Sequence, residues 1–179
     1  MKLNNTKIEQ LKEADINLNS SFVEIPFLYT PVLKELKRKE SQIKKIYFTI
    51  NSEMLLFNGV VLSILRLFDI PEKLEQDKDN VLLTYSDKTI EIEFTNTGLI
   101  YSGCCELHNS NLVFSENLPY IKVELPSERE SVIVLPEGDG FYYMALDKKE
   151  SEQADRLSII GNPAKLKECY LWLTDHLNG

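Results

Sequence analysis

The chain has 179 residues, of which 43% are hydrophobic and 27% are charged. This composition excludes a disordered polypeptide, and the length suffices to bury a core without disulfide bonds or a structural metal. The formal net charge of −8 is concentrated in residues 71–155, which carry 18 acidic and 7 basic side chains, a net of −11. Such an acidic region repels nucleic-acid backbones, so we expect no nucleic-acid partner and favour a basic protein partner.

The first residues, MKLNNTKIEQL, contain neither the apolar core nor the small-residue cleavage site of a secretory signal. The longest apolar-rich run, residues 54–65, is shorter than the about 20 residues that a membrane-spanning helix needs. The three cysteines, two of them adjacent, imply no disulfide framework. We therefore expect a cytoplasmic protein with reduced thiols and no membrane contact.

The N-terminal segment is predicted to combine helical and extended pieces. Residues 8–14 have the pattern of a short amphipathic helix, and residues 21–29 that of an extended chain. Thr30 and Pro31 then provide an N-cap and a first helical position for a helix with a basic polar face. That basic face is the kind of surface that could contact a partner in an assembly.

The segment from residue 52 to residue 70 allows two structures. Its apolar residues recur at helical spacing, which predicts a buried helix that ends before Pro71. The dipeptide Asn58-Gly59 between apolar runs is instead a strong hairpin signal. We favour the helix, which would lie between a strand at residues 43–50 and a polar, acidic connection at residues 69–80.

From Val81 onward the hydrophobic pattern changes to a period of two, which is typical of strands. Seven strands are predicted at residues 81–87, 89–96, 98–108, 111–117, 120–126, 131–137 and 140–147, and residues 156–161 are a candidate for the eighth. The short turns between them predict an antiparallel meander. Asn162 and Pro163 begin a C-terminal helix that places Leu166, Cys169, Tyr170 and Leu173 on one face.

The predicted fold class is therefore α+β: a central antiparallel β-meander of about seven to eight strands, with N-terminal helices and a C-terminal helix packed on the sheet. We expect residues 1–42 to form an N-terminal helical and extended segment and residues 43–179 a single α+β domain. The two parts are expected to form one compact unit.

The stretch SGCCELHNS, residues 102–110, gathers two thiols and an imidazole. In a strand, Cys104 and Cys105 point to opposite faces, and His108 lies about 13 Å from Cys104 along the same face. Zinc ligands must lie within about 2.3 Å of one point, so we expect no metal site, and no motif indicates a cofactor. For a cysteine nucleophile, His176 of the C-terminal helix is the base that could approach one of the thiols.

Cys104, Cys105, His108 and His176 are therefore the catalytic candidates, although one of the two adjacent cysteines also fits the buried face of a strand. No GxxxxGK[ST], GxSxG, HExxH or GxGxxG pattern occurs in the sequence.

The stretch GDGFYYMALD, residues 138–147, resembles the Gly-Asp, aromatic, Leu-Asp stretch of SUKH-type immunity proteins, which are α+β modules that neutralise toxins. The resemblance covers ten of the 179 residues, and on these residues we do not assign the chain to that family.

We expect a non-enzymatic, acidic protein-binding module, one version of which is an immunity or antitoxin-type inhibitor of a cationic protein. The candidate binding residues are aromatic and acidic side chains: Tyr120, Tyr142, Tyr143, Glu91, Glu93, Glu137 and Asp139. The alternatives are a small enzyme that uses the Cys104 or Cys105 thiol, and a structural or assembly module. Exposed sheet edges also make a homodimer an expectation.

Overall fold

The structure is a computed structural model, which describes residues 30–53, 57–96, 98–118, 120–126, 130–134 and 163–177. The helices are α2 (Pro31–Arg38), α3 (Phe57–Phe68) and α5 (Pro163–Leu177), and a short 3-10 turn spans Glu40–Gln42. The strands are β1 (Ile43–Asn51), β2 (Lys73–Asp77), β3 (Asn80–Thr84), β4 (Thr89–Thr95), β5 (Tyr101–Leu107), β6 (Asn111–Ser115), β7 (Tyr120–Glu124) and β8 (Glu130–Val134).

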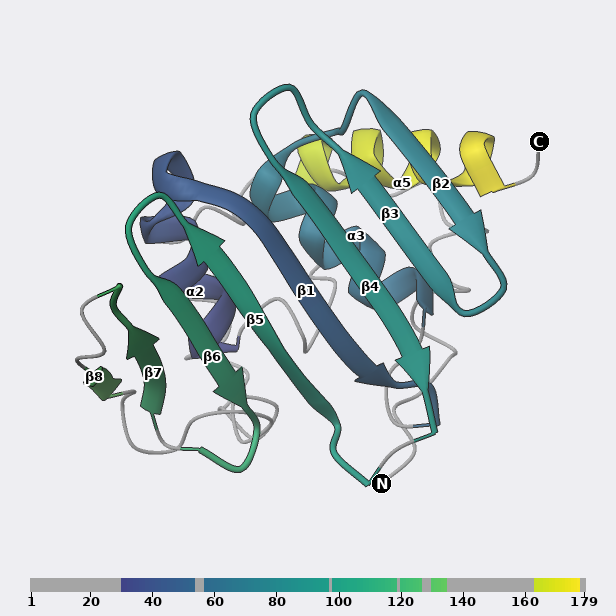
Figure 1. Ribbon diagram of the computed structural model, residues 1–179. Coiled ribbons are helices and arrows are strands. Elements are labelled where there is room, and N and C mark those ends of the chain that lie inside the picture. Colours follow the sequence, from purple (N-terminus) through teal and green to yellow (C-terminus); the bar gives the residue numbers. More distant parts are fainter. Residues whose placement is uncertain are drawn as a thin grey trace.

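The strands form one mixed sheet in the order β2-β3-β4-β1-β5-β6-β7-β8 (Figure 1). β1 lies in the middle, parallel to β4 and antiparallel to β5. The predicted antiparallel meander is therefore wrong, although the α+β class and strands β3 to β8 are found close to their predicted places.

The position of β1 explains the error. The chain leaves β1 through α3, returns through the β2–β3 hairpin, and then lays β4 beside β1 in the same direction. Five residues separate the end of β4 from the start of β5, which lies on the other side of β1. Two strand spacings of about 4.8 Å are well within the reach of five extended residues. Alternation identifies each strand, but it carries no information on which strands are neighbours.

β2 was predicted as a polar connection and is instead an edge strand. Its sequence KLEQD contains one apolar residue, Leu74, which packs partly buried against the core. Main-chain pairing with β3 holds the strand, and the turn between them places Lys78 in the left-handed region with φ of 51°. The charged residues on β2 also protect this edge against pairing with other strands.

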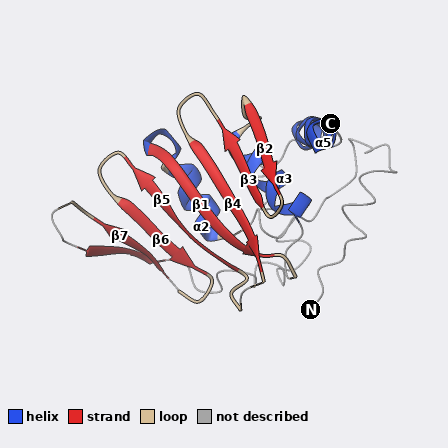
Figure 2. Ribbon diagram, turned by 45° about the vertical axis from the view of Figure 1, so that its right-hand side comes forward, coloured by secondary structure: helices blue, strands red, loops and turns tan. Residues whose placement is uncertain are grey.

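The three helices lie on one side of the sheet (Figure 2). Buried strand side chains that point toward them form the core with α3, and those no more than 1% exposed include Ile46, Phe48, Ile50, Val81, Leu83, Ile90, Ile92, Leu112 and Phe114. From Gly59 to Phe68 every residue of α3 is buried, including the polar Ser63 and Arg66, as expected of a helix enclosed by a sheet and other helices. The choice of a helix over a hairpin at Asn58-Gly59 is therefore confirmed.

α5 begins at Pro163 and buries Cys169, Tyr170 and Leu173, as the sequence pattern indicates. It packs against α3. The predicted elements at residues 8–14, 21–29, 140–147 and 156–161 lie outside the described residues. Within the described part of the chain, no helix is long and apolar enough to span a membrane.

Gly103 fills a position where any side chain would clash. It lies between Phe48 of β1 and Phe114 of β6 in the register of the sheet, and the two phenyl rings approach to 5.5 Å between centroids. A Cβ atom on Gly103 would lie 2.2 Å from the main-chain oxygen of Tyr47 and 2.8 Å from the Phe114 ring. The absence of a side chain at this position of β5 therefore lets the Phe48 and Phe114 rings meet across β5.

We expect Gly103→Ala to lower the free energy of unfolding by about 1–3 kcal/mol, because the new methyl group overpacks the core and meets main-chain atoms that cannot easily move. Urea denaturation followed by circular dichroism measures the change. Ser102→Ala, one residue away and on the opposite face of β5, is the control and should change stability by less than about 0.5 kcal/mol. Equal stability of the Gly103→Ala and Ser102→Ala variants would contradict this packing.

Candidate functional site

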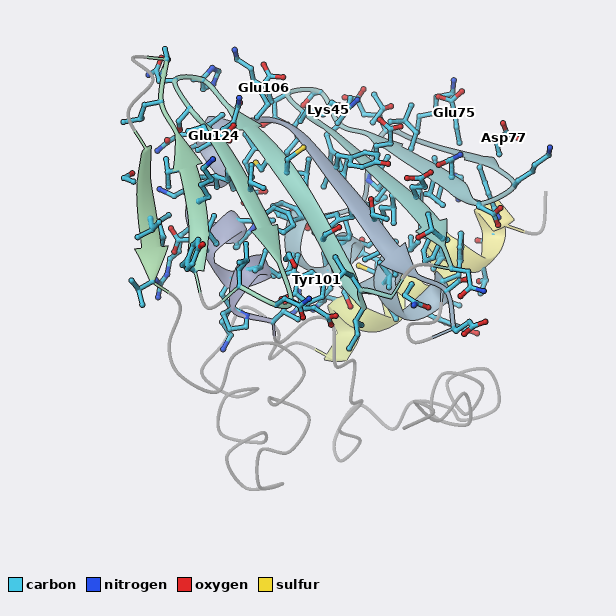
Figure 3. All side chains as sticks on the ribbon, turned by 60° about the horizontal axis from the view of Figure 1, so that its bottom comes forward. Lys45, Glu75, Asp77, Tyr101, Glu106 and Glu124 are labelled. Carbon is cyan, nitrogen blue, oxygen red and sulfur yellow. The ribbon has the colours of Figure 1, made fainter. Side chains whose placement is uncertain are left out.

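The side of the sheet opposite the helices is a broad side-chain surface, which we call the open face. Residues directly opposite each other on neighbouring strands point to the same face, so the register defines its members. They are Lys73, Glu75 and Asp77 of β2, Asn80, Leu82 and Thr84 of β3, Thr89, Glu91 and Glu93 of β4, Lys45, Tyr47 and Thr49 of β1, Ser102, Cys104 and Glu106 of β5, Asn111, Val113 and Ser115 of β6, Tyr120, Lys122 and Glu124 of β7, and Val132 and Val134 of β8. In Figure 3 the labelled Lys45, Glu75, Glu106 and Glu124 lie on the side away from the helices.

One row of this face crosses all eight strands, which we call the middle row. Its members in register are Glu75, Leu82, Glu91, Tyr47, Cys104, Val113, Lys122 and Val132. Leu82, Tyr47 and Val113 are half-buried, Cys104 is exposed and Val132 is 55% exposed. Apolar and aromatic groups thus run along the centre of an otherwise polar surface.

Two paired interactions organise the centre of the open face. The Tyr47 hydroxyl donates a short hydrogen bond to the Glu93 carboxylate, and Lys45 Nζ lies 2.7 Å from the Glu91 carboxylate. The hydrogen bond to Glu93 and burial raise the pKa of Tyr47 above its usual value, so its hydroxyl stays protonated at neutral pH. The centre of the open face therefore presents the uncharged phenol of Tyr47 and two carboxylates, those of Glu91 and Glu93, each of which has a partner.

Charge on the open face is segregated by strand. β2 and β4 contribute four carboxylates, Glu75, Asp77, Glu91 and Glu93, against one base on the same side, Lys73, which bonds Glu75 at 2.8 Å. On β6 to β8 the register positions of this face hold one base, Lys122, and two acids, Glu124 and Glu130, and Lys122 and Glu124 are paired at 3.2 Å. The open face is thus more acidic on β2 to β4 than on β6 to β8.

The two adjacent cysteines lie on opposite faces of β5, as strand geometry predicts. Cys105 is 1% exposed on the helix side, and burial raises its pKa to about 12. Cys104 is on the open face, where burial raises its pKa and the nearby Lys45 opposes the shift. Both thiols are therefore protonated at neutral pH, which disfavours a cysteine nucleophile.

The histidines do not approach these thiols. His108 follows the end of β5 in an exposed turn, where its main-chain N–H bonds Gln42. His176 stacks on Trp172 of its own helix, with 4.0 Å between ring centroids, and its Nδ1 lies 2.8 Å from the Trp172 carbonyl oxygen. α5 lies beside α3 behind β2 and β3, away from β5 (Figures 1 and 2). Among the described residues no group of three or more His, Cys, Asp or Glu side chains could hold a metal ion.

Three of the candidate binding residues are on the open face. Glu91 and Glu93 lie near its centre, each engaged as described above, and Tyr120 lies on β7 opposite Val134. The remaining candidates, Glu137, Asp139, Tyr142 and Tyr143, fall outside the described residues.

A second polar cluster lies on the helix side, where α3 ends. Asp69 follows α3 in the left-handed region with φ of 68°, and its carboxylate bonds Lys165 of α5 at 2.8 Å. The Tyr85 hydroxyl donates to the main-chain oxygen of Asp69 at 3.0 Å, and burial raises the pKa of Tyr85. The bond to Lys165 holds the pKa of Asp69 below its usual value. These contacts join α3, α5 and the β3–β4 turn, so we assign the cluster a structural role.

Three basic side chains at the C-terminal end of α2 pair with carboxylates of the same segment. Lys37 pairs with Glu40, and Arg38 and Lys39 lie 3.5 Å and 3.7 Å from the carboxylate of Glu35. Glu40 also lies 3.5 Å from the buried Lys88. Because two carboxylates serve three bases of this segment, the ion pairs compensate its positive charge only in part.

Sequence reasoning missed most of the middle row. Tyr47, Leu82, Val113 and Lys122 each occupy the polar-side position of an alternating strand. That alternation could have assigned them to the solvent side, but only the strand order places them in one row.

No family model and no curated protein matches the sequence. Solved structures match the fold. A dehydrogenase (MviM) from Clostridium difficile gives a TM-score of 0.61 at 12% identity, over 86% of this chain and 60% of its own. UDP-N-acetylglucosamine 3-dehydrogenase GnnA from Acidithiobacillus ferrooxidans gives 0.59 at 9% identity, over 84% and 58%. An oxidoreductase from Bacillus cereus gives 0.56 at 10% identity, over 86% and 62%. The chain thus spans about three fifths of the length of these proteins.

These structures correct the function expected from the sequence. The fold of this chain is one that oxidoreductases and dehydrogenases adopt, so the prediction of a non-enzymatic immunity or antitoxin-type protein-binding module is wrong. The prediction depended on the acidity of residues 71–155 and on aromatic side chains taken as exposed, and neither specifies a fold. At these identities the likeness concerns the fold alone.

We expect one thiol to react with Ellman's reagent in the native protein in dilute solution, because Cys104 is exposed whereas Cys105 and Cys169 are buried. The reaction should be slower than that of free cysteine at pH 8 and should keep accelerating above pH 9, because burial raises the pKa of the Cys104 thiol. Cys104→Ser should remove this phase, while unfolding in guanidinium should expose all three thiols of the wild type. Two or three fast thiols in the native protein would contradict the assigned faces of β5 and α5.

Proposed function

We propose that this chain is the mixed-sheet part of an oxidoreductase and that it works beside a separate nucleotide-binding unit. The observation that carries the proposal is the fold likeness over 84–86% of this chain to proteins that are longer and are named dehydrogenases or oxidoreductases. The nucleotide-binding unit would belong to a longer form of the polypeptide or to another protein.

The described residues of this chain do not fit a dinucleotide. Dinucleotide-binding units place a glycine-rich turn between a strand and a helix, so that main-chain amides at the helix N-terminus meet the pyrophosphate. The described strand that leads directly into a helix is β1, and it is followed by Ser52 and Glu53. A carboxylate at this place repels a pyrophosphate, and the sequence contains no GxGxxG pattern. We therefore derive no hydride-transfer step from these residues.

Two units with different roles account for both the fold likeness to dehydrogenases and the lack of a dinucleotide-binding turn in the described residues. The nicotinamide would supply the hydride chemistry in its own unit, and the mixed-sheet part would supply a rigid scaffold for assembly and for one wall of the active site. UDP-N-acetylglucosamine is the first substrate to test, because one of the similar structures is named for it.

We expect the purified chain alone to give no saturable signal when titrated with NADH or NADPH by fluorescence. Combined with a GxGxxG-containing protein encoded beside it, it should oxidise UDP-N-acetylglucosamine or a related hydroxylated substrate, with the formation of NAD(P)H followed at 340 nm. Each protein alone, and the combination with the chain unfolded beforehand, are the controls.

Saturable NAD(P)H binding and turnover by this chain alone would contradict the proposal of a separate nucleotide-binding unit. A combination that is as inactive as its separate parts, for every such neighbouring protein, would contradict the oxidoreductase role itself.

A further inference from the structure

The C-terminal helix α5 is attached to the fold differently from the strands. It packs mainly against α3, at the outer end of the helix layer (Figure 2), and its side chains Cys169, Tyr170 and Leu173 are buried there. Each inner strand of the sheet is instead held by main-chain hydrogen bonds along both edges. The chain reaches α5 from β8 through residues 135–162, so no short turn ties α5 to a strand.

An ion pair joins the beginning of α5 to the end of α3. Lys165 Nζ lies 2.8 Å from the Asp69 carboxylate, and both side chains reach solvent, with exposed fractions of 27% for Lys165 and 69% for Asp69. Because the pair is partly exposed, dissolved salt can screen it, whereas salt does not weaken the apolar contacts beneath it. The attachment of α5 thus combines a few buried side chains with a contact that solvent conditions can change.

Two buried thiols lie in the two differently attached parts. Cys169 of α5 is 0% exposed, and Cys105 is 1% exposed on β5, which pairs with β1 and β6 along its two edges. Exposing Cys105 requires the sheet to come apart, whereas exposing Cys169 requires only that α5 leaves α3. Because a buried thiol is inert until it is exposed, the two rates of labelling report these two openings separately.

We propose that α5 reversibly detaches from α3 as a unit while the sheet stays folded, and that the Asp69–Lys165 ion pair favours the attached state. The inference does not depend on the proposed function. Elements held by few buried contacts are the ones that open at low cost, ahead of global unfolding. Detachment would uncover the side of α3 that α5 covers, so a partner that binds this side would shift the equilibrium toward the detached state.

Native-state thiol labelling of the full chain in a Cys104→Ser background tests the proposal, because Cys105 and Cys169 are then the two thiols left. Iodoacetamide is the reagent, since it carries no charge, and mass spectrometry of the peptides distinguishes the two labelled cysteines. Without denaturant, Cys169 should be labelled at least about tenfold faster than Cys105. Low concentrations of urea should accelerate Cys105 more steeply than Cys169, because opening of the sheet exposes more surface.

A variant of the ion pair, made in the same background, tests its role. Asp69→Asn should raise the rate at Cys169 about two- to fivefold, as expected for the loss of a partly exposed ion pair, and leave Cys105 unchanged. Asparagine tolerates the left-handed backbone of residue 69. Glu75→Gln is the control, because it neutralises the acid of an exposed pair of the same 2.8 Å length on β2, and it should change neither rate. Circular dichroism verifies that each variant is folded.

Salt gives an independent test of the same contact. Raising the NaCl concentration from about 0.05 M to about 0.5 M should accelerate labelling of Cys169 in the parent protein, because the Debye length falls well below that of dilute buffer. The same change should have little effect on Cys169 in the Asp69→Asn variant, which has no ion pair to screen.

Equal labelling rates of Cys169 and Cys105 at every urea concentration would overturn the proposal, since global unfolding would then expose both thiols. An unchanged Cys169 rate in the Asp69→Asn variant, or an equal change in the Glu75→Gln variant, would overturn the role of the ion pair.

Amide hydrogen exchange determines whether α5 moves as a unit. Amides along the whole of α5 should exchange at a common rate that is faster than the rate of β1 and β5, and Asp69→Asn should accelerate this group alone. Exchange that is fast at one end of α5 and slows steadily along it would indicate fraying and would contradict detachment as a unit.

Discussion

The insertion of β1 between two strands from the later part of the chain is the constraint on which the other elements depend. β1 pairs along both edges, parallel to β4 and antiparallel to β5, and through them it positions both outer halves of the sheet. Its inward side chains, Ile46, Phe48 and Ile50, are fully buried against the helices. Gly103 of β5 lies between Phe48 and Phe114, and because it has no side chain the two rings can meet.

The same strand also determines the character of the opposite side. Lys45, Tyr47 and Thr49 alternate with the buried residues, and pairing with β4 brings the first two within reach of Glu91 and Glu93. Because the acidic β2–β3–β4 unit lies on one side of β1 and the more apolar β6–β7–β8 unit lies on the other, the open face is divided into unlike halves.

Much of the local structure could be predicted from the sequence, because local pattern carries it. Helical spacing identified α3 despite Asn58-Gly59, Pro163 marked the start of α5, and alternation placed Cys104 and Cys105 on opposite faces. β2 has a single apolar residue, so no pattern distinguished it from a loop. The strand order depends on contacts between residues far apart in the chain, such as Tyr47 with Glu93, which alternation does not encode. The net charge of residues 71–155 was counted correctly, but it gave a wrong prediction of function. A sum over the segment does not show that the sheet concentrates acidic side chains of the open face on β2 and β4.

A disulfide engineered between β1 and β5 tests the central claim, the insertion of β1 between β4 and β5, most directly. Thr49 and Ser102 lie directly opposite each other on these strands, so Thr49→Cys with Ser102→Cys, in a Cys104→Ser background whose other cysteines are buried, places two thiols within disulfide reach. The account predicts that mild oxidation forms an intramolecular disulfide in this variant, whereas Thr49→Cys with Thr84→Cys, two strands apart on the same face, stays reduced. Oxidation of both pairs to the same extent, or of neither, would contradict the insertion.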